Sequence, residues 1–308
     1  MFQHTQGRQF KGFTGRAVHV AAVVGIAGAL VFVHPGKAAS VGYGTYKYKA
    51  GFDSCTSVFQ NNPSDLETWW LYSPYWVYSF DLKGASYQTY RQCTSLSATN
   101  VAMAASEGWG IIPIWYGPQM PSPCWTPPYA SLINLNTSTA YTQGVQEADK
   151  AATAASSLGL AADGVIMYDL EGEGKGTSSC VNAARAFVDG WDYEMNVNTL
   201  YWAGLYGGTQ TVNFRDFAPP NIANVPFNIM PWYPGDVTGV YQLADLPDDL
   251  WSQDQRFHQL RKDEDEQNYG GAPAYINEDC SDSRVFTNNT VAINDSVNNC
   301  NSYDHPNP

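Results

Sequence analysis

The chain has 308 residues, of which 29 are acidic and 16 basic, so its formal net charge is −13. This excess of negative charge repels the phosphates of nucleic acids and the headgroups of anionic lipids, which argues against nucleic acid as a partner. Hydrophobic residues make up 44% of the sequence, and the length after a cleaved leader suits one large domain with a substantial core.

The first 38 residues are typical of a secretory signal peptide. Basic residues precede an apolar stretch at residues 17–33, and the small residues Gly36 and Ala38 suit cleavage after Ala38, with Ala39 as the other option. An uncleaved membrane anchor is the alternative, although the stretch is short for a span of roughly 20 apolar residues. Removing residues 1–38 takes away four basic residues and no acids, so the mature chain has a formal charge of −17. We expect a secreted protein without a membrane span.

After this segment, short apolar runs alternate with helical patterns, as in repeated βα units. One predicted helix begins at Ser64, and three others cover residues 98–107, 139–158 and 182–195. The predicted strands are one that ends at Asp53 and those at residues 75–80, 109–117, 163–170, 200–206, 227–232, 257–260 and 274–277. About eight strands interleaved with helices favour a (β/α)8 barrel of the TIM type over a doubly wound sheet.

All six cysteines follow the signal segment, and an even number in an exported chain predicts disulfides. The spacing does not select the pairing, but a bridge between Cys280 and Cys300 would hold down the polar tail. We therefore expect residues 39–280 to form the barrel and residues 281–308 to form a polar C-terminal extension. No Cys-x-x-Cys spacing is present, so the sequence predicts no thiolate zinc site and no other cofactor.

Only two histidines, His258 and His305, remain after the signal segment. They are too few for a histidine-rich metal centre. A Ser-His-Asp triad would have to use His258, and no Gly-x-Ser-x-Gly motif accompanies it. We interpret His258 as a structural residue.

The most informative stretch runs from Asp163 to Gly174, where an apolar run ends in Asp169-Leu170-Glu171 and is followed by glycines. Alternation along a strand puts Asp169 and Glu171 on the same side, with Cα atoms about 6.5 Å apart. Acids at a strand end are also common as solvated loop residues, which is the alternative. In a barrel, functional residues gather at the carboxyl ends of the strands. The other predicted strand ends carry Asp53, Trp115, Tyr116, Trp232 and Asp279.

Carboxylates and aromatic rings are the groups that glycoside hydrolysis requires. In this interpretation Glu171 is the general acid, and nearby Asp169 and Asp53 raise its pKa while remaining ionised. Glu173 is an alternate acid. The rings at the rim and Asp279 would bind the sugar, although an aromatic share of 14% also suits an aromatic-rich core.

Five motifs occur in family order along nearly the whole mature chain. Together they resemble the glycoside-hydrolase-like barrel domain of secreted bacterial proteins, which is related to lysozyme-type muramidase barrels. The resemblance implies that Asp53, Asp169 and Glu171 form an acidic centre and that Gln119 is a pocket residue. The motifs are Gly-Phe-Asp-Ser-Cys at 51–55, Gly-Trp-Gly-Ile-Ile-Pro-Ile-Trp-Tyr-Gly-Pro-Gln at 108–119, Gly-x-x-Glu-Ala-Asp-x-Ala at 144–151, Val-Ile-Met-Tyr-Asp-Leu-Glu at 165–171 and Gly-Leu-Tyr-Gly-Gly at 204–208.

Two functional hypotheses follow, because one fold hosts unrelated functions. The first is a secreted glycoside hydrolase that acts on cell-wall or related amino-sugar polysaccharide by carboxylate acid/base catalysis. The alternative is a non-catalytic carbohydrate-binding or cell-envelope protein on the same barrel. In both hypotheses the partner is a polysaccharide or a peptidoglycan-type glycan.

Overall fold

The structure is a computed structural model, and part of the chain is described in it. The predicted signal segment, Cys55, Cys93 and His305 lie outside the described residues, and so do the expectations that concern them. The described residues are 40–54, 59, 62, 64–83, 96–125, 131–175, 177–232, 239–243, 246–260, 265–289, 293–294 and 300.

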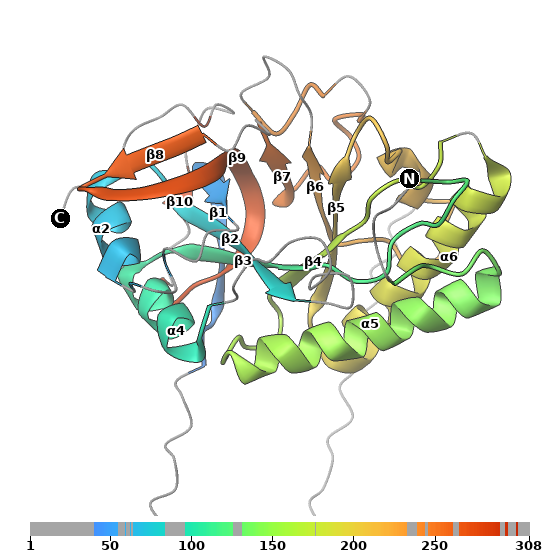
Figure 1. The fold of residues 1–308 in the computed structure, drawn as a ribbon, viewed down its shortest axis with the longest axis horizontal. Coiled ribbons are helices and arrows are strands. Elements are labelled where there is room, and N and C mark those ends of the chain that lie inside the picture. Colours follow the sequence, from blue (N-terminus) through green and yellow to red (C-terminus); the bar gives the residue numbers. More distant parts are fainter. Residues whose placement is uncertain are drawn as a thin grey trace, which may run out of the picture. The chain divides into compact units, whose positions relative to one another are not determined.

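Within the described residues, eight strands close a barrel, and seven of them are parallel (Figure 1). The eighth, β9 (Ala272–Phe286), lies between β7 and β1 and runs antiparallel to both. The predicted barrel class is therefore confirmed, with one strand reversed. The parallel strands are β1 (Tyr43–Asp53), β2 (Val77–Lys83), β3 (Gly110–Trp115), β4 (Val165–Asp169), β5 (Trp202–Gly208), β6 (Asn228–Trp232) and β7 (Gln255–Gln259).

The reversal of β9 results from a hairpin that the sequence-based assignment did not include. Strand β8 (Asp265–Tyr269) pairs antiparallel with the start of β9, and the turn between them contains Gly270 and Gly271, both with positive φ. The hairpin turns the chain round before it enters the barrel wall. β9 is also much longer than the predicted strand at residues 274–277, and it continues to Phe286 in pairing with β1 and β7. A short strand, β10 (Ile293–Asn294), pairs with the start of β1.

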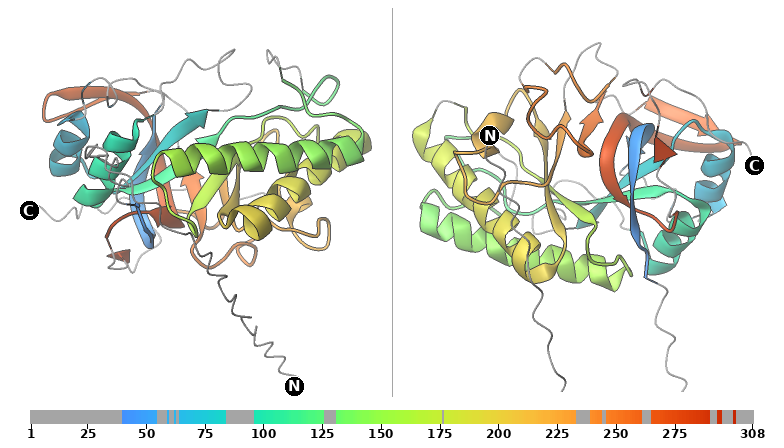
Figure 2. Two further views of the ribbon diagram at one scale, coloured as in Figure 1. Left: turned by 90° about the horizontal axis from the view of Figure 1, so that it is seen from below. Right: turned by 180° about the vertical axis from the view of Figure 1, so that it is seen from behind.

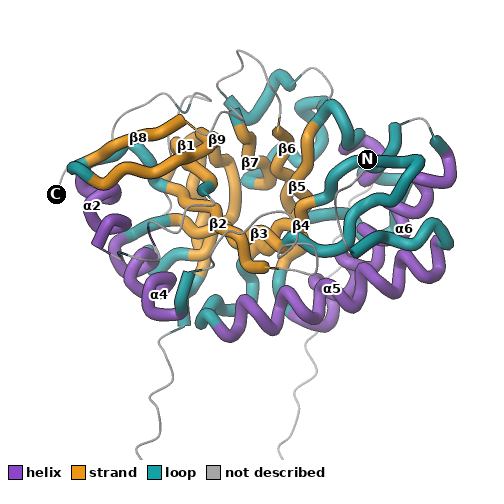
Figure 3. The backbone as a smooth tube through the Cα atoms, in the orientation of Figure 1, coloured by secondary structure: helices purple, strands orange, loops and turns teal. Residues whose placement is uncertain are grey.

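The described helices lie outside the ring of strands (Figure 3). Local contacts determine where the helices begin and end. In the helix at Ala98–Glu107, the Ser97 hydroxyl caps the start by accepting a hydrogen bond from the Asn100 N–H, and Gly108, with φ 114°, terminates the helix. No described helix combines the length and the apolar character that a membrane span requires. The helices are α2 (Ser64–Tyr72), α4 (Ala98–Glu107), α5 (Thr137–Ser157) and α6 (Ser178–Glu194), which continues into a π-helical turn at Met195–Thr199.

Helices α5 and α6 pack side by side with almost no space between their backbones (Figure 2). A Cβ atom on Gly144 would lie 2.0 Å from the carbonyl oxygen of Phe187, and one on Gly190 would lie 2.2 Å from that of Tyr141. These glycines are thus required by the close approach of the two helices. The pair covers the barrel next to β4 and fixes the strand that carries Asp169.

The barrel wall separates two clusters of buried side chains. Tyr168 packs against Phe187 and Trp191 of α6, with ring centroids 4.8 and 5.1 Å apart, so its neighbour Met167 faces the barrel interior. Since strand side chains alternate, the interior cluster identifies the inward face of each strand. It consists of Tyr46, Trp76, Val77, Ile112, Ile114, Val165, Met167, Met230, Phe257 and Val285.

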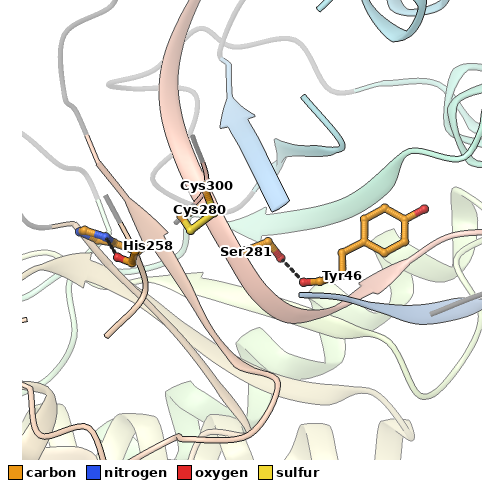
Figure 4. Close-up of a disulfide and its surroundings, with 6 residues drawn as sticks. Tyr46, His258, Cys280, Ser281 and Cys300 are labelled. Carbon is orange, nitrogen blue, oxygen red and sulfur yellow. Dashed lines mark hydrogen bonds between the residues drawn. A yellow bond between two sulfur atoms is a disulfide. The ribbon is translucent and has the colours of Figure 1, made fainter. Parts of the chain in front are cut away.

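Two disulfides join described residues, Cys124–Cys180 and Cys280–Cys300. The second is the bridge that the sequence suggested for the polar tail, and it ties residue 300 to β9 (Figure 4). Beside it, the Ser281 hydroxyl donates a hydrogen bond to the Tyr46 carbonyl. His258 is fully buried, with its Nδ1 atom 2.7 Å from the carbonyl oxygen of Gly239, which is a structural contact.

Candidate active site

The carboxyl-terminal ends of β1 to β7 meet at one rim of the barrel, and polar side chains gather on the inward face there. Positions on this face follow from the interior cluster by steps of two residues along each strand. In β1 an irregularity between Lys47 and Lys49 shifts the alternation, and Gly51 identifies the inward face beyond it, because its Cβ would lie 3.2 Å from the interior ring of Phe257. The inward residues at the rim are Asp53 of β1, Asp81 of β2, Tyr116 after β3, Asp169 of β4, Tyr206 of β5, Trp232 of β6, Gln259 of β7, and Asn277 and Asp279 of β9.

Asp53 is held by two amide side chains from other strands. The Gln259 Nε2 donates to Asp53 Oδ2, and the Asn277 Nδ2 donates to Asp53 Oδ1 at 2.8 Å. The Tyr206 hydroxyl in turn donates to Gln259 Oε1 at 3.0 Å, which orients that amide. A carboxylate that accepts two amide hydrogen bonds is stabilised in its ionised form. The network therefore fixes the position and orientation of the Asp53 carboxyl group at the rim.

Asp279 lies next to Asp53 and is 1% exposed. On β9 it stands opposite Gly51 of β1 and Gln259 of β7. Burial raises the pKa of Asp279 well above its ordinary value, and the charges of Asp53 and then Glu278 raise it further. These effects favour the protonated form of Asp279, and carboxyl groups in such different environments can acquire separate acid and base roles.

The Asp169-Leu170-Glu171 segment is held in place by Gln119. Gln119 Nε2 donates to the carbonyl of Asp169 at 2.6 Å and to that of Gly117 at 3.2 Å, while its Oε1 accepts from the Glu171 N–H at 2.6 Å. Gln119 is fully buried, as is Asp169, whereas Glu171 is half-buried. Gln119, a pocket residue in the sequence-based interpretation, thus positions the backbone on both sides of Leu170.

The three aromatic candidates fall in two different layers. The Trp115 indole N–H donates to Glu147 Oε2 of α5 at 2.8 Å, so this ring faces the helices rather than the rim. Tyr116 is buried, and because it lies two residues after Ile114 of the interior cluster, its side chain also points into the barrel. Trp232 is half-buried and packs on Gly208, where a Cβ would lie 2.8 Å from the ring. Tyr116 and Trp232 are therefore the rings that accompany the acids.

Glu173, the alternate acid, is fully buried in the loop between β4 and α6. Its Oε1 accepts from the Asn213 N–H at 2.7 Å, and its own N–H donates to the Thr211 carbonyl at 3.1 Å. Burial raises the pKa of Glu173 to about 8, against the lowering effect of the Asn213 hydrogen bond. The carboxyl group is thus bound to the backbone of the segment that follows β5.

Sequence reasoning did not assign a role to Asp81, Gln259 or Asn277. Each occupies the inward face at the end of a strand, so alternation alone would have found them once the register was known. Among the residues that the structure describes, no group of three His, Cys, Asp or Glu side chains has an arrangement suited to a metal ion.

A family model for the Rv2525c-like, glycoside hydrolase-like domain matches residues 68–282, which is more than half of the chain. The chain belongs to this family. The Rv2525c-like match confirms the resemblance that the sequence motifs indicated, and it covers β2 to β7 and most of β9. No curated protein matches the sequence.

Three solved structures are similar to the chain. An uncharacterised B. stearothermophilus protein has 12% identity and a TM-score of 0.46, with 76% of this chain and 95% of that one covered. The Clostridium perfringens spore cortex lytic enzyme SleM has 10% identity and a TM-score of 0.44, with coverage of 78% and 67%. The modular autolysin LytC from Streptococcus pneumoniae, solved with a synthetic peptidoglycan ligand, has 11% identity and a TM-score of 0.45, with coverage of 75% and 46%. The chain thus spans less than half the length of LytC.

Proposed function

We propose that this protein is a secreted glycoside hydrolase that cleaves cell-wall or related amino-sugar polysaccharide. The observation that carries the proposal is the gathering of four carboxyl groups at one rim: Asp53, which Gln259 and Asn277 hold in place, and Asp279, Asp169 and Glu171. The family description, glycoside hydrolase-like, supports the same chemistry. The disulfides Cys124–Cys180 and Cys280–Cys300 support export to an oxidising compartment.

The rim can supply each group that the reaction requires. Glu171 lies two residues beyond the end of β4 and is half-buried, so its carboxyl group can reach the oxygen of the leaving sugar as general acid. The carboxyl groups of Asp169 and Asp53 stabilise the positive charge that develops at the anomeric carbon, or orient water. Asp279, whose protonated form is favoured by burial, donates a hydrogen bond to a substrate oxygen. Trp232 offers the sugar a ring face.

The experiment is the Glu171→Gln substitution, assayed by release of reducing ends from purified peptidoglycan and from polymers of N-acetylglucosamine. Loss of the general acid is expected to lower the rate by at least about a hundredfold, with the melting temperature unchanged. Glu173→Gln is the matched control, because that carboxyl group is bound to Asn213 and is expected to be dispensable for turnover.

Full activity of Glu171→Gln would refute the assignment of the acid. Loss of activity in Glu173→Gln, with activity retained in Glu171→Gln, would transfer the role to Glu173 and refute the proposed geometry as well.

Glycan binding without turnover is the second candidate. The burial of Asp169 and Asp279, at 0% and 1% exposure, favours it, because neither carboxyl group is open to solvent. In that case the protein retains the polysaccharide, releases no reducing ends, and binds equally well after Glu171→Gln. Trp232→Ala would then weaken retention, since Trp232 is the half-buried ring at the rim.

A further inference from the structure

The β8–β9 hairpin extends from the barrel beyond the carboxyl-terminal rim and over α2 (Figure 1). The first five residues of β9, Ala272 to Ile276, pair with β8, and pairing with β1 begins at Asn277, opposite Asp53. On this projecting part Ala272, Ala274 and Ile276 are buried, whereas Pro273 and Tyr275 are exposed. The hairpin therefore has one face packed on the protein and one face open to solvent.

The packed face holds the hairpin rigidly beside the rim. The Trp69 indole N–H of α2 donates to the Ala272 carbonyl at 2.8 Å, and the Trp69 and Tyr269 rings lie 5.0 Å apart. The Ser54 hydroxyl, next to Asp53, donates to the Tyr275 carbonyl at 2.7 Å. The backbone at Tyr275 is thus attached to the end of β1, and its position relative to Asp53 is fixed.

The open face of the hairpin is the outward continuation of the acidic face of β9. Tyr275, Asn277 and Asp279 are two residues apart, so they point to the same side of the strand. Tyr275 and Asp279 are four residue steps apart along the strand, a distance of roughly 13 Å, which is longer than one pyranose ring. Tyr275 is 49% exposed. No described residue forms a hydrogen bond or ring contact with its side chain.

Isolated exposed aromatic residues are common on proteins and need no function. Tyr275 differs from these in its position, because it lies in line with two residues of the candidate site and on a fixed backbone. Its cross-strand partner is Glu266, and exposed Asn268 stands opposite Pro273 on the same hairpin. A flat ring with a carboxylate and an amide beside it can stack on a sugar and bind its hydroxyl or acetamido groups.

We propose that Tyr275, Glu266 and Asn268 form a sugar-binding subsite that extends the rim along the β8–β9 hairpin. The ligand is an uncharged N-acetylhexosamine ring of the polysaccharide, at least one ring beyond the sugar at the acids. The carboxylate of Glu266 and the net charge of −13 disfavour an anionic sugar there. The substrate class rests on the proposed function, whereas the subsite itself is a statement about binding.

The test measures binding separately from turnover, in the full chain carrying Glu171→Gln. Titrations with the hexamer and the dimer of N-acetylglucosamine compare a ligand that can reach Tyr275 with one that cannot. Tyr275→Ala is expected to weaken hexamer binding by about tenfold, the usual effect of removing an aromatic anchor, and to leave dimer binding unchanged. Tyr275→Phe keeps the ring and is expected to bind within about twofold of the parent.

Tyr193→Ala is the matched control, since Tyr193 of α6 is also an exposed tyrosine, at 38%. It is expected to change neither affinity. If Tyr275→Ala does not fold, Asn268→Ala provides the second variant, with an expected loss for the hexamer of about threefold.

Equal hexamer binding by the parent and Tyr275→Ala would overturn the subsite without affecting the Glu171 assignment. Equal weakening of hexamer and dimer would also overturn it, because the ring would then contact the sugar at the acids. Tyr275-dependent hexamer binding, together with no release of reducing ends by the chain in which Glu171 is intact, would support the subsite and refute hydrolysis. The two proposals therefore fail through different measurements.

Discussion

Replacement of Glu173 by glutamine is expected to stabilise the protein at neutral and alkaline pH. In the folded state the Glu173 carboxyl group is fully buried, and one of its oxygens accepts a hydrogen bond from the Asn213 N–H. Glutamine has the same shape, keeps that acceptor and carries no charge. The variant therefore resembles the protonated form of Glu173 at every pH.

The size of the effect follows from the difference in proton affinity between the folded and unfolded chain. Burial raises the pKa of Glu173 from 4.5 to about 8, so between these values the group is neutral when folded and ionised when unfolded. Stability is then lost as pH rises through this window, and each pKa unit corresponds to about 1.4 kcal/mol. The full loss amounts to about 5 kcal/mol by pH 9, an upper limit because the loop can relax and admit water.

The assay is chemical denaturation of the wild type and of Glu173→Gln between pH 4 and 9. The two free energies of unfolding are expected to agree near pH 4, where Glu173 is protonated in both states, and to diverge progressively up to pH 8 in favour of the variant. The low-pH agreement is the internal control. A difference that does not change with pH, or a variant less stable than the wild type at pH 8, would refute the reasoning.

Two further predictions concern the packing of α5 against α6 and the disulfide between Cys124 and Cys180. Gly190→Ala adds a methyl group 2.2 Å from the Tyr141 carbonyl oxygen. Despite the better helix propensity of alanine, it is expected to lower the free energy of unfolding by at least about 2 kcal/mol, and an unchanged denaturation midpoint would contradict the close packing of α5 and α6. The Cys124→Ser/Cys180→Ser double variant opens a disulfide with a sequence separation of 56 residues. It is expected to lose about 2 to 4 kcal/mol under oxidising conditions, and equal stability before and after the change would show that the loop needs no covalent link.

The order of the elements was predictable because most strands are buried apolar runs and because side chains cap the starts of α4 and α5. Helix α4 has the predicted bounds, and α5 begins at Thr137 rather than at residue 139. β9 was largely missed because it is a polar strand. Its inward side chains bind other polar groups inside the barrel, as Ser283 does with Asn228, so it lacks an apolar alternation.

The strand ends were predictable, but the direction of individual side chains was not. All six residues of β3 are buried, so its composition does not distinguish the inward face from the outward one. This is why Trp115 was placed at the rim, whereas its indole N–H contacts Glu147 of α5. The Gln119 hydrogen bonds to Asp169 and Glu171 join residues about 50 positions apart, and no local pattern encodes them.

Strand β9, which closes the barrel, determines when the candidate site can form during folding. Asp53 is near the beginning of the described chain, and its partner Asn277 and neighbour Asp279 arrive more than 220 residues later on β9. Contacts of such high sequence separation form late in folding, because a long loop must close first. The arrival of β9 therefore completes the acidic rim, and a chain that stops before residue 277 carries Asp53 without its partner Asn277 or its neighbour Asp279.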